Sequence, residues 1–495
     1  MATLTIRKGG LTTQIVFDAP LPLSAALSQA GFMQAHPCGG LGKCGKCAVQ
    51  LCGKVSAPNA PEQRAGVRLS CQAVLLGDAE VILPDDTQNA RIETGGRFAA
   101  SSHAPLGKSL GAAIDIGTTT VALRLLNLNT GEALAEASAL NPQARYAADV
   151  IGRIAAAMHG EGAALQSLIA DCIGALLSEA CAKCNHRKDE VDALVITGNT
   201  TMLYLLTGKN PESLSHAPFE ADCLFDQLLQ KDGVSVYLPS CMNAFVGADI
   251  TCAALASGLC AGDSTALLCD VGTNGEIALY KNGKLYVTST AAGPAFEGAG
   301  ISCGMGSAAG TIDAVSIVNG SLHAHTIGDR PAVGVCGSGL IDAVNAFLDL
   351  GLIDETGYVD TDDGRLPLAG GVALIAKDIR AVQLCKAAIA AGIDTLLSAT
   401  DTSLSDIEHI YLAGGFGSHL NLHSAAGIGL LPRKLIPRVH VIGNGALSGA
   451  CMMLLSREDI HTARHIASVS THVELGGNPT FSALYMEHMM FPERD

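Results

Sequence analysis

The chain has 495 residues, of which 48% are hydrophobic and 16% charged, and a formal net charge of −16. Such a length predicts more than one domain, each with enough apolar material for a core. An acidic chain without Trp lacks the basic clusters and stacking rings of nucleic-acid-binding proteins, so we expect no nucleic-acid partner. No uninterrupted apolar run of about 18 residues and no apolar leader occurs. We therefore expect a cytoplasmic protein without a membrane partner, whose 17 cysteines do not form a disulfide framework.

The first 84 residues predict a small domain of β-strands with one short helix. The strands are expected at 3–8, 12–18, 48–55 and 79–84, and the helix at 21–31. Gly9 and Gly10 separate the first two strands, which is a β-hairpin signal. This order of elements suits a β-grasp ferredoxin domain over residues 1–84.

Four cysteines in this first domain form a candidate metal centre. Cys38, Cys44 and Cys47 have the spacing C-x5-C-x2-C, and Cys71 follows in a separate segment. The spacing is close to that of plant-type ferredoxins, with one residue added in the first gap, and thiolates are the ligands of iron–sulfur clusters. We predict such a cluster on these four cysteines. A structural zinc site is the alternative, although zinc sites usually show two CxxC pairs.

The rest of the chain changes character twice. Residues 85–108 are polar, contain Gly, Ser and Pro, and show no clear periodicity, which is typical of a linker. From residue 109, helical segments alternate with short apolar strands that end in glycine-bearing turns. This pattern predicts an α/β enzyme that binds its ligand at the carboxyl ends of its strands. We expect two lobes, over residues 109–265 and 266–495.

Two strand–turn–strand segments of the α/β part repeat one another. Residues 112–123 (AAIDIGTTTVAL) and 266–279 (ALLCDVGTNGEIAL) both contain an apolar strand, an Asp, a Gly–Thr turn and a second apolar strand. The repeat predicts two similarly folded halves that face each other across a cleft.

Each repeated turn has the groups that bind phosphate. Backbone amides of such a turn can point at phosphate oxygens, Thr hydroxyls add donors, and a carboxylate can hold Mg²⁺ through water. A single Asp-x-Gly turn is common, but ATP with Mg²⁺ needs groups on both sides of its phosphates, so the pair favours an ATP site. The candidates are Asp115, Gly117, Thr118, Thr119 and Thr120 in the first turn, and Asp270, Gly272, Thr273, Asn274 and Gly275 in the second.

Two further features complete the candidate site. In LAGGFGSHL (412–420), the turn at Gly414, Gly415 and Phe416 would let the backbone approach an adenosine ring; an ordinary strand-to-helix turn is equally consistent with the sequence. Glu297, in GPAFEG, is the acid that we single out beyond the phosphate turns. It acts on the attacking water, contacts the partner protein, or is a common helix-start carboxylate.

The three turns, in this order, resemble those of the ATPase superfamily of acetate and sugar kinases, heat-shock ATPases and actin. DIGTTT (115–120) matches its first phosphate motif, DVGTNGE (270–276) its second, and LAGGFGS (412–418) its adenosine motif. ITGNTTM (196–202) and GNGALSGA (443–450) fall where its connecting segments belong. The resemblance implies a two-lobed, actin/hexokinase-like ATPase after the ferredoxin domain.

Three more segments resemble the reductive activators of corrinoid proteins. They are AAGPAFEGAGISCGMG (291–306), VGVCGSGLIDAV (333–344) and KDIRAVQLCKAAIAAGI (377–393). Members of that family place an N-terminal 2Fe–2S ferredoxin domain before such an ATPase. Better-known members carry a longer segment between the two parts than residues 85–108 provide.

This resemblance implies an activity, cofactors and partners. The activator would bind the corrinoid protein of a methyltransferase system, hydrolyse ATP with Mg²⁺, and reduce inactive Co(II) to Co(I) with one electron from its 2Fe–2S cluster. Asp115, Asp270 and Glu297 would be catalytic, and an upstream low-potential electron donor would refill the cluster. A homodimer is one assembly that the sequence leaves open.

Three other functions stay open at this point. A small-molecule kinase of the same fold would need an acceptor pocket with an Asp base, which we do not identify, and would have no use for a ferredoxin domain. An ATP-driven electron donor to a different metalloenzyme would resemble activators that share one cluster between two subunits and have no ferredoxin domain. A scaffold switched by nucleotide would hold its partner without reducing it.

Overall fold

The computed structural model describes residues 1–8, 11–30, 32, 47–65, 67–83, 98–414 and 420–494. The chain divides into two compact units, and each is described by itself. The first unit comprises Met1–Asn89 and Pro142–Ala156, and the second comprises Ala90–Asn141 and Ala157–Asp495.

The first unit is built on a mixed sheet with the strand order β2-β1-β6-β4-β5, and β3 pairs with β6. Its elements are β1 (Ala2–Lys8), β2 (Leu11–Phe17), β3 (Leu21–Pro22), α1 (Leu23–Gln29), β4 (Ala48–Val55), α2 (Ala60–Ala65), β5 (Arg68–Leu69), β6 (Val74–Ile82), η2 (Pro142–Arg145) and α3 (Val150–Ala156). The predicted hairpin is confirmed, because β1 and β2 pair in antiparallel register. The parallel pairing of β1 with β6 then places the first and last strands side by side, as in a ferredoxin domain.

Alternation of apolar side chains explains the core of this unit. Leu4 and Ile6 of β1 are fully buried, whereas the residues between and after them are more exposed. Leu23 and Leu27 lie one turn apart on α1 and bury the same face of that helix. The short helix therefore packs its apolar face against the sheet.

The second unit contains two six-stranded sheets of the same design. The orders are β11-β12-β10-β7-β8-β9 and β22-β21-β13-β14-β15-β23. The strands of the first sheet are β7 (Leu110–Ile116), β8 (Thr120–Asn127), β9 (Ala133–Leu140), β10 (Val191–Gly198), β11 (Gln227–Lys231) and β12 (Val234–Leu238). Those of the second sheet are β13 (Ala266–Val271), β14 (Gly275–Lys281), β15 (Lys284–Thr290), β21 (His409–Ala413), β22 (Val439–Gly443) and β23 (Ser470–His472).

In each sheet three consecutive antiparallel strands are followed by two strands that run parallel to the first of them. β7 pairs antiparallel with β8 and parallel with β10, and β13 pairs antiparallel with β14 and parallel with β21. The repeated Asp-x-Gly-Thr segments are the β7–β8 and β13–β14 hairpins. The predicted duplication into two similarly folded halves is therefore confirmed.

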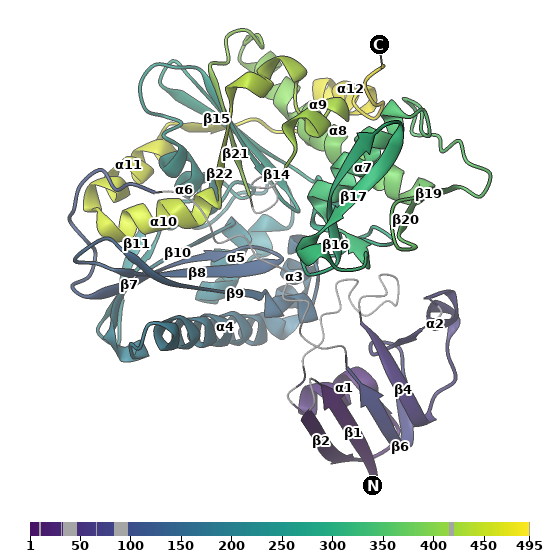
Figure 1. Cartoon of the computed structure of the whole chain (residues 1–495). Coiled ribbons are helices and arrows are strands. Elements are labelled where there is room, and N and C mark those ends of the chain that lie inside the picture. The colour runs from purple at the N-terminus through teal and green to yellow at the C-terminus, as the bar shows by residue number, and fades with distance from the viewer. Residues whose placement is uncertain are drawn as a thin grey trace. The chain divides into compact units, whose positions relative to one another are not determined.

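Helices connect and cover these sheets (Figure 1). They are α4 (Gly162–Lys183), α5 (Thr200–Thr207), α6 (Ala248–Ser257), α7 (Gly337–Asp349), α8 (Ala376–Ala399), α9 (Leu422–Gly427), α10 (Gly445–Leu455), α11 (Arg457–Ser468) and α12 (Pro479–Glu487). Shorter helical turns are η3 (Ala157–Glu161), η4 (Lys188–Glu190), η5 (Glu212–Leu214), η6 (Pro294–Glu297), η7 (Ile327–Asp329) and η9 (Arg433–Arg438). An insertion in the second half adds β16 (Thr311–Val318), β17 (Ser321–Thr326), β18 (Gly334–Val335), β19 (Arg365–Pro367) and β20 (Ala373–Ile375).

A glycine contact joins the helices α6 and α10, which come from different halves. A Cβ atom at Gly449 would stand 2.1 Å from the carbonyl oxygen of Cys252, and one at Gly445 would stand 3.1 Å from the Cβ of Ala253. The two backbones therefore approach each other more closely than any side chain at position 449 would allow. The helices lie next to each other in Figure 1 and share one buried apolar cluster.

The described part of the predicted linker is held against the same region. The backbone amides of Ala104 and Leu106 donate to the carbonyls of Leu455 and Leu454, and Leu106 is buried. Residues 98–108 thus pack on the end of α10.

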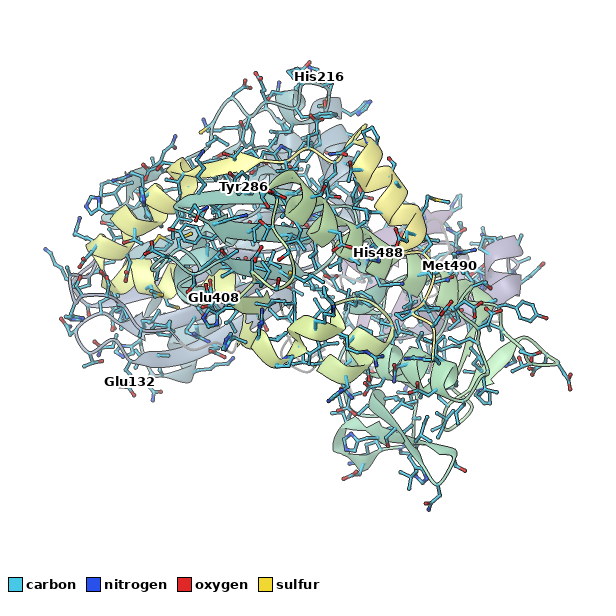
Figure 2. The ribbon with its side chains drawn as sticks, turned by 90° about the horizontal axis from the view of Figure 1, so that it is seen from above. Glu132, His216, Tyr286, Glu408, His488 and Met490 are labelled. Carbon is cyan, nitrogen blue, oxygen red and sulfur yellow. The ribbon has the colours of Figure 1, made fainter. Side chains whose placement is uncertain are left out.

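The C-terminal segment is held on α8. His488 Nε2 bonds Asp394 Oδ2 at 2.7 Å, and Gln383 Nε2 donates to the carbonyl of Met489 at 2.8 Å. The buried Lys386 donates to the carbonyl of Met490 and lies over the ring of Phe491. Figure 2 shows His488 and Met490 close together on this segment.

Within the part of the chain that the structure describes, two helical stretches are long and apolar enough to cross a membrane by length and composition. Ala376–Ala399 buries 78% of its apolar window within the structure. Val150–Lys183 is interrupted, because Gly160 has a φ of +97° inside it.

Candidate functional site

The two repeated hairpins meet at their turns. Each turn is closed by its own backbone, through the bonds Gly117 N to Thr120 O and Gly272 N to Asn274 O. The Oγ1 atoms of Thr119 and Thr273 lie 3.3 Å apart, although 154 residues separate them in the chain. The structure thus brings the two predicted phosphate turns together at one site.

Glu297 connects the two turns. Its Oε2 accepts from Thr119 Oγ1 at 2.8 Å, and both of its carboxylate oxygens lie 3.0 Å from Thr273 Oγ1. It ends η6, which is placed by a bond from the amide of Gly293 to the carbonyl of Thr273. Burial raises the pKa of Glu297, while the two Thr hydroxyls lower it. The structure therefore places the carboxylate of Glu297 between the two predicted phosphate turns.

Buried carboxylates belong to this site, and burial is the main cause that raises the pKa of each. Burial raises the pKa of Asp115 to about 6, against the lowering effect of its bond with Asn444. Burial, and then the charges of Asp115 and Glu297, raise the pKa of Asp270 to about 7. Burial and the charge of Asp115 raise that of Asp249 to about 7. So many buried acids favour a bound cation, because a cation would compensate their charges.

Polar partners fix the first turn and its aspartate. Asn199 Nδ2 donates to Thr118 Oγ1 at 3.2 Å, and Asn141 Nδ2 donates to the carbonyl of Gly117 at 2.8 Å. Asn444 Nδ2 donates to Asp115 Oδ2 at 3.0 Å. Thr120 and Gly275, also predicted as site residues, are the first residues of β8 and β14.

The predicted adenosine turn begins at the same place. Gly414 follows β21, and its amide donates to the carbonyl of Gly443. A Cβ atom at Gly414, whose φ is +97°, would stand 2.7 Å from Asp270 Oδ1. Glycine is therefore required there for close approach to the second phosphate turn. Gly415 and Phe416 lie outside the described residues.

Asp249 and Asn444 are among the residues at the site that were not predicted as functional. Asp249 lies at the start of α6 without a recognisable phosphate motif, although it is an acid that follows a glycine at a helix start, in VGAD. Asn444 falls within GNGALSGA, which was matched only as a connecting segment. Its Asn at a helix N-cap was the available signal.

The carboxylates of the site fit a Mg²⁺ ion that also has water and phosphate oxygens as ligands. Among the residues that the structure describes, no three His, Cys, Asp or Glu side chains are placed to hold a metal ion by themselves. Mg²⁺ usually keeps several waters and binds one or two carboxylates together with phosphate oxygens. Asp115 and Asp270 can supply such carboxylates.

The first unit holds the described half of the predicted cluster site. Cys47 is buried, and its Sγ lies 3.3 Å from Cys71 Sγ. This separation exceeds the length of a disulfide bond, about 2.05 Å. Two of the four predicted sulfur ligands therefore lie next to each other without being bonded. Ser70 N donates to the carbonyl of Cys47 and so ties the two segments together. Cys38 and Cys44 lie outside the described residues.

Three family models match the chain. A 2Fe–2S iron–sulfur cluster binding domain matches residues 6–76, the RACo middle region matches 110–261, and the C-terminal domain of RACo, the ASKHA domain, matches 264–495. These matches cover both units.

Individual proteins are similar along much of their length. The corrinoid activation enzyme RamQ of Eubacterium limosum is 35% identical over 419 residues, which cover 77% of this chain and 70% of that protein. The Co(II) methylated amine-specific corrinoid protein reductase of Methanosarcina barkeri is 27% identical over 276 residues, 51% of this chain and 50% of that protein. A solved reductive activator for corrinoid, iron–sulfur protein superposes with a TM-score of 0.75 and 26% identity, over 100% of this chain and 99% of that one.

An ASKHA fold with a 2Fe–2S ferredoxin domain in the same chain defines a class of ATP-dependent electron-transfer activators. The chain belongs to the RACo family of reductive activators of corrinoid proteins. The predicted fold class and the predicted activity, ATP-dependent reductive activation of a corrinoid protein, are thereby confirmed.

Proposed function

We propose that this chain reduces the Co(II) form of a corrinoid protein to Co(I), one electron at a time, while it hydrolyses Mg²⁺-bound ATP. The single observation that carries the ATP half is the contact of Thr119, Thr273 and Glu297, which joins both phosphate turns at one point. The sulfur pair of Cys47 and Cys71 supports the redox half. When bound, the cluster supplies a one-electron carrier, and Mg²⁺ supplies charge neutralisation at the phosphates.

The residues of the ATP site take separate roles. Hydroxyls of Thr119 and Thr273, with the turn amides around Gly117 and Gly272, bind and orient the phosphate chain. Glu297 accepts a proton from the attacking water, for which a carboxyl with a raised pKa is suited near neutral pH. Asp115 and Asp270 hold the cation, and Asn444 orients Asp115.

The same contact suggests how nucleotide changes the protein. Phosphate groups between the two turns would take hydrogen bonds that Glu297 now accepts from both halves, so ATP and ADP would favour different arrangements of η6 and the hairpins. A ligand shifts such an equilibrium only through its different affinity for the two states. We propose that the ATP-bound arrangement binds the Co(II) protein and that hydrolysis of the bound ATP is required for electron transfer to cobalt.

The remaining partners follow from this activity. Cys38, Cys44, Cys47 and Cys71 hold the cluster, and an upstream low-potential donor must return each electron that is delivered. The corrinoid protein belongs to a methyltransferase system. We place the reaction in the cytoplasm and expect neither a nucleic-acid nor a membrane partner.

An anaerobic assay tests the proposal. The protein with its cluster reduced is mixed with a Co(II) corrinoid protein, and formation of Co(I) is followed by absorbance without nucleotide, with ATP, and with a non-hydrolysable ATP analogue. We expect rapid Co(I) formation only with ATP. Equal rates in all three mixtures would show that nucleotide hydrolysis is not coupled to the electron transfer.

A further inference from the structure

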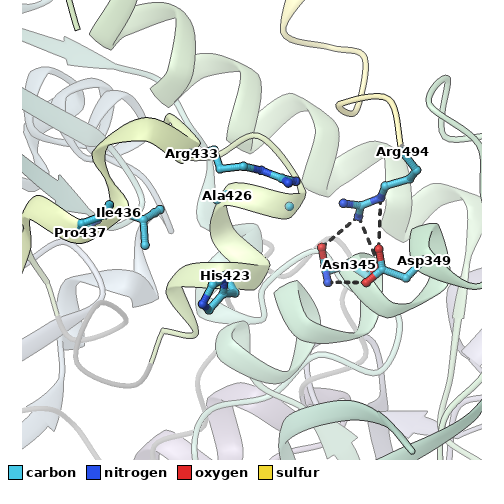
Figure 3. Close-up of a pocket in the computed structure, with 9 residues that line it drawn as sticks. Asn345, Asp349, His423, Ala426, Arg433, Ile436, Pro437 and Arg494 are labelled. Atoms are coloured by element: carbon cyan, nitrogen blue, oxygen red, sulfur yellow. Dashed lines mark hydrogen bonds and ion pairs between the residues drawn. The ribbon is translucent and has the colours of Figure 1, made fainter. Parts of the chain in front are cut away.

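A cavity with polar and apolar lining lies in the second unit, outside the residues assigned to ATP (Figure 3). Its volume is about 380 Å³, and it is lined by parts of α7, α9, η9 and the C-terminal segment. A cavity of this size accommodates a small organic ligand. Neither phosphate turn contributes a lining residue.

Two guanidinium groups face each other in this cavity. Figure 3 shows the side chains of Arg433 and Arg494 extending toward one another from opposite walls. Burial lowers the pKa of Arg494, the charge of Asp349 opposes this effect, and the nearby charge of Arg433 adds to the lowering. Asp349 pairs with Arg494 Nε at 3.3 Å and is the one carboxylate among the lining residues.

Arg494 is held in place by a short network. Its Nη2 donates to Asn345 Oδ1 at 2.9 Å, and Asn345 Nδ2 donates to Asp349 Oδ2 at 2.9 Å. The network neutralises one of the two guanidinium groups and fixes its orientation. Arg433 is exposed and makes no hydrogen bond or ion pair with any side chain that the structure describes, so its guanidinium group is available to a ligand at the mouth of the cavity.

The floor of the cavity depends on a glycine. A Cβ atom at Gly427, near the end of α9, would stand 1.8 Å from Asn345 Oδ1 and 3.3 Å from Arg494 Nη1. Any larger residue would displace the network from this position. Ile436 and Pro437 form an apolar part of the cavity wall, and His423 adds a further polar group to the lining. Polar groups fixed beside an apolar wall are typical of a small-ligand site.

We propose that this cavity binds a phosphate oxyanion between Arg433 and Arg494, at a site separate from the ATP phosphates. Planar guanidinium forks bind phosphate through paired, charge-assisted hydrogen bonds. The oxyanion can be inorganic phosphate, which ATP hydrolysis releases, or the phosphate of a second nucleotide. A carboxylate ligand would have fewer acceptor oxygens for two facing forks.

Calorimetric titration of the full chain tests this site. The ATP site is first saturated with a non-hydrolysable ATP analogue, and inorganic phosphate is then titrated at constant ionic strength; a second arm titrates ADP. We expect phosphate to bind, and Arg433→Gln and Arg494→Gln each to weaken binding about tenfold or more, the effect of losing a charge-assisted hydrogen bond. The control Lys434→Gln removes the same charge from the same turn outside the cavity and should leave the affinity unchanged.

Each outcome decides the proposal. Additional ADP binding that disappears in Arg433→Gln would identify a nucleotide as the source of the phosphate, whereas binding of inorganic phosphate alone would identify the free ion. Binding that is absent, equally strong in Arg433→Gln, or abolished by the ATP analogue would overturn it. Thermal melting and analogue binding of each variant show that its fold is intact.

Discussion

The role proposed for the Glu297 carboxylate can be tested directly with one substitution. Glu297→Gln keeps the shape and an acceptor oxygen for Thr119 and Thr273 but removes the proton acceptor. We expect ATP hydrolysis to fall by about 10²-fold, the usual size of a general-base contribution, while nucleotide binding persists. Phosphate release and analogue binding measure the two effects.

The matched control for this variant is Glu132→Gln, because Glu132 is an exposed acid at the turn between β8 and β9. It should hydrolyse ATP at the rate of the parent chain. If Glu297→Gln also keeps the parent rate, the acid only fastens the two turns together and another group must accept the proton.

Asp270 predicts how stability depends on pH. Its pKa is raised from 3.8 to about 7 in the folded chain, so the folded state keeps a proton that the unfolded state has lost. The stabilisation from that proton is complete below about pH 4 and is lost as the pH rises to about 7. Asp270→Asn removes this effect, and we expect it to be more stable than the parent by about 4 kcal/mol at pH 8, with a smaller difference at pH 5.

Urea unfolding without nucleotide at pH 5 and pH 8 measures the difference. Asp263→Asn, which replaces an exposed acid near β13, should show no gain at pH 8. If Asp270→Asn has the same free energy of unfolding as the parent at pH 8, then burial and the neighbouring acids do not raise the pKa of Asp270.

The sequence pattern predicted some residues of the ATP site and missed others. Asp115 and Asp270 could be predicted because each stands in a repeated Asp-x-Gly-Thr segment whose chemistry is local. Asp249 could not, because nothing beside it in the chain shows that it lies near Asp115; their proximity arises from packing of α6 on the sheet. The role of Glu297 depended equally on a contact across 178 residues.

Among the elements, the N-terminus of α10 serves structure and site at once. Asn444 Oδ1 accepts from Leu447 N at 2.7 Å as the helix cap, and its Nδ2 donates to Asp115. Asn444→Ala should lower the free energy of unfolding by about 1 kcal/mol through loss of the cap and should also weaken nucleotide binding. Asn444→Ser can still cap the helix but cannot reach Asp115 with an amide, so it should restore stability without restoring affinity.

Chemical denaturation and analogue titration separate the two effects. If Ser restores both properties, the bond to Asp115 contributes nothing to binding. If neither variant alters binding, Asp115 does not need this orientation.

Strands and turns of the two halves followed from local patterns. The apolar runs at 193–198 and 439–445 became β10 and β22, and the hairpins formed where Gly–Thr turns were expected. The order of the strands in each sheet could not be predicted in the same way, because parallel neighbours such as β13 and β21 are separated by more than a hundred residues in the chain. The segment 98–108 looked like linker because its polar composition hides Leu106, which is buried beside α10.

For the whole molecule, the separate roles of cluster and ATPase predict separable defects. Cys47→Ser should remove the visible absorbance of the cluster and abolish Co(I) formation, while ATP hydrolysis continues, because Cys47 lies in the first unit and the phosphate turns lie in the second. Cys52→Ser is the control, since Cys52 is exposed on β4 and is no predicted ligand. Anaerobic spectra, iron content and phosphate release provide the measurements.

Retention of the full absorbance by Cys47→Ser would contradict the ligand assignment. A zinc-containing, colourless parent protein would contradict the cluster itself. Loss of ATP hydrolysis together with the absorbance would show that the two functions depend on each other for folding.

The backbone contact of Gly449 with Cys252 limits how the two halves can move. Since a carbonyl group occupies the space of any side chain at position 449, α6 and α10 are in contact along their main chains at that point. Sliding of one helix along the other would drive neighbouring side chains into this narrow crossing, whereas rotation about it would leave the contact intact. An opening motion that admits and releases nucleotide should therefore be a hinge rotation of one half relative to the other, with its axis passing close to Gly449.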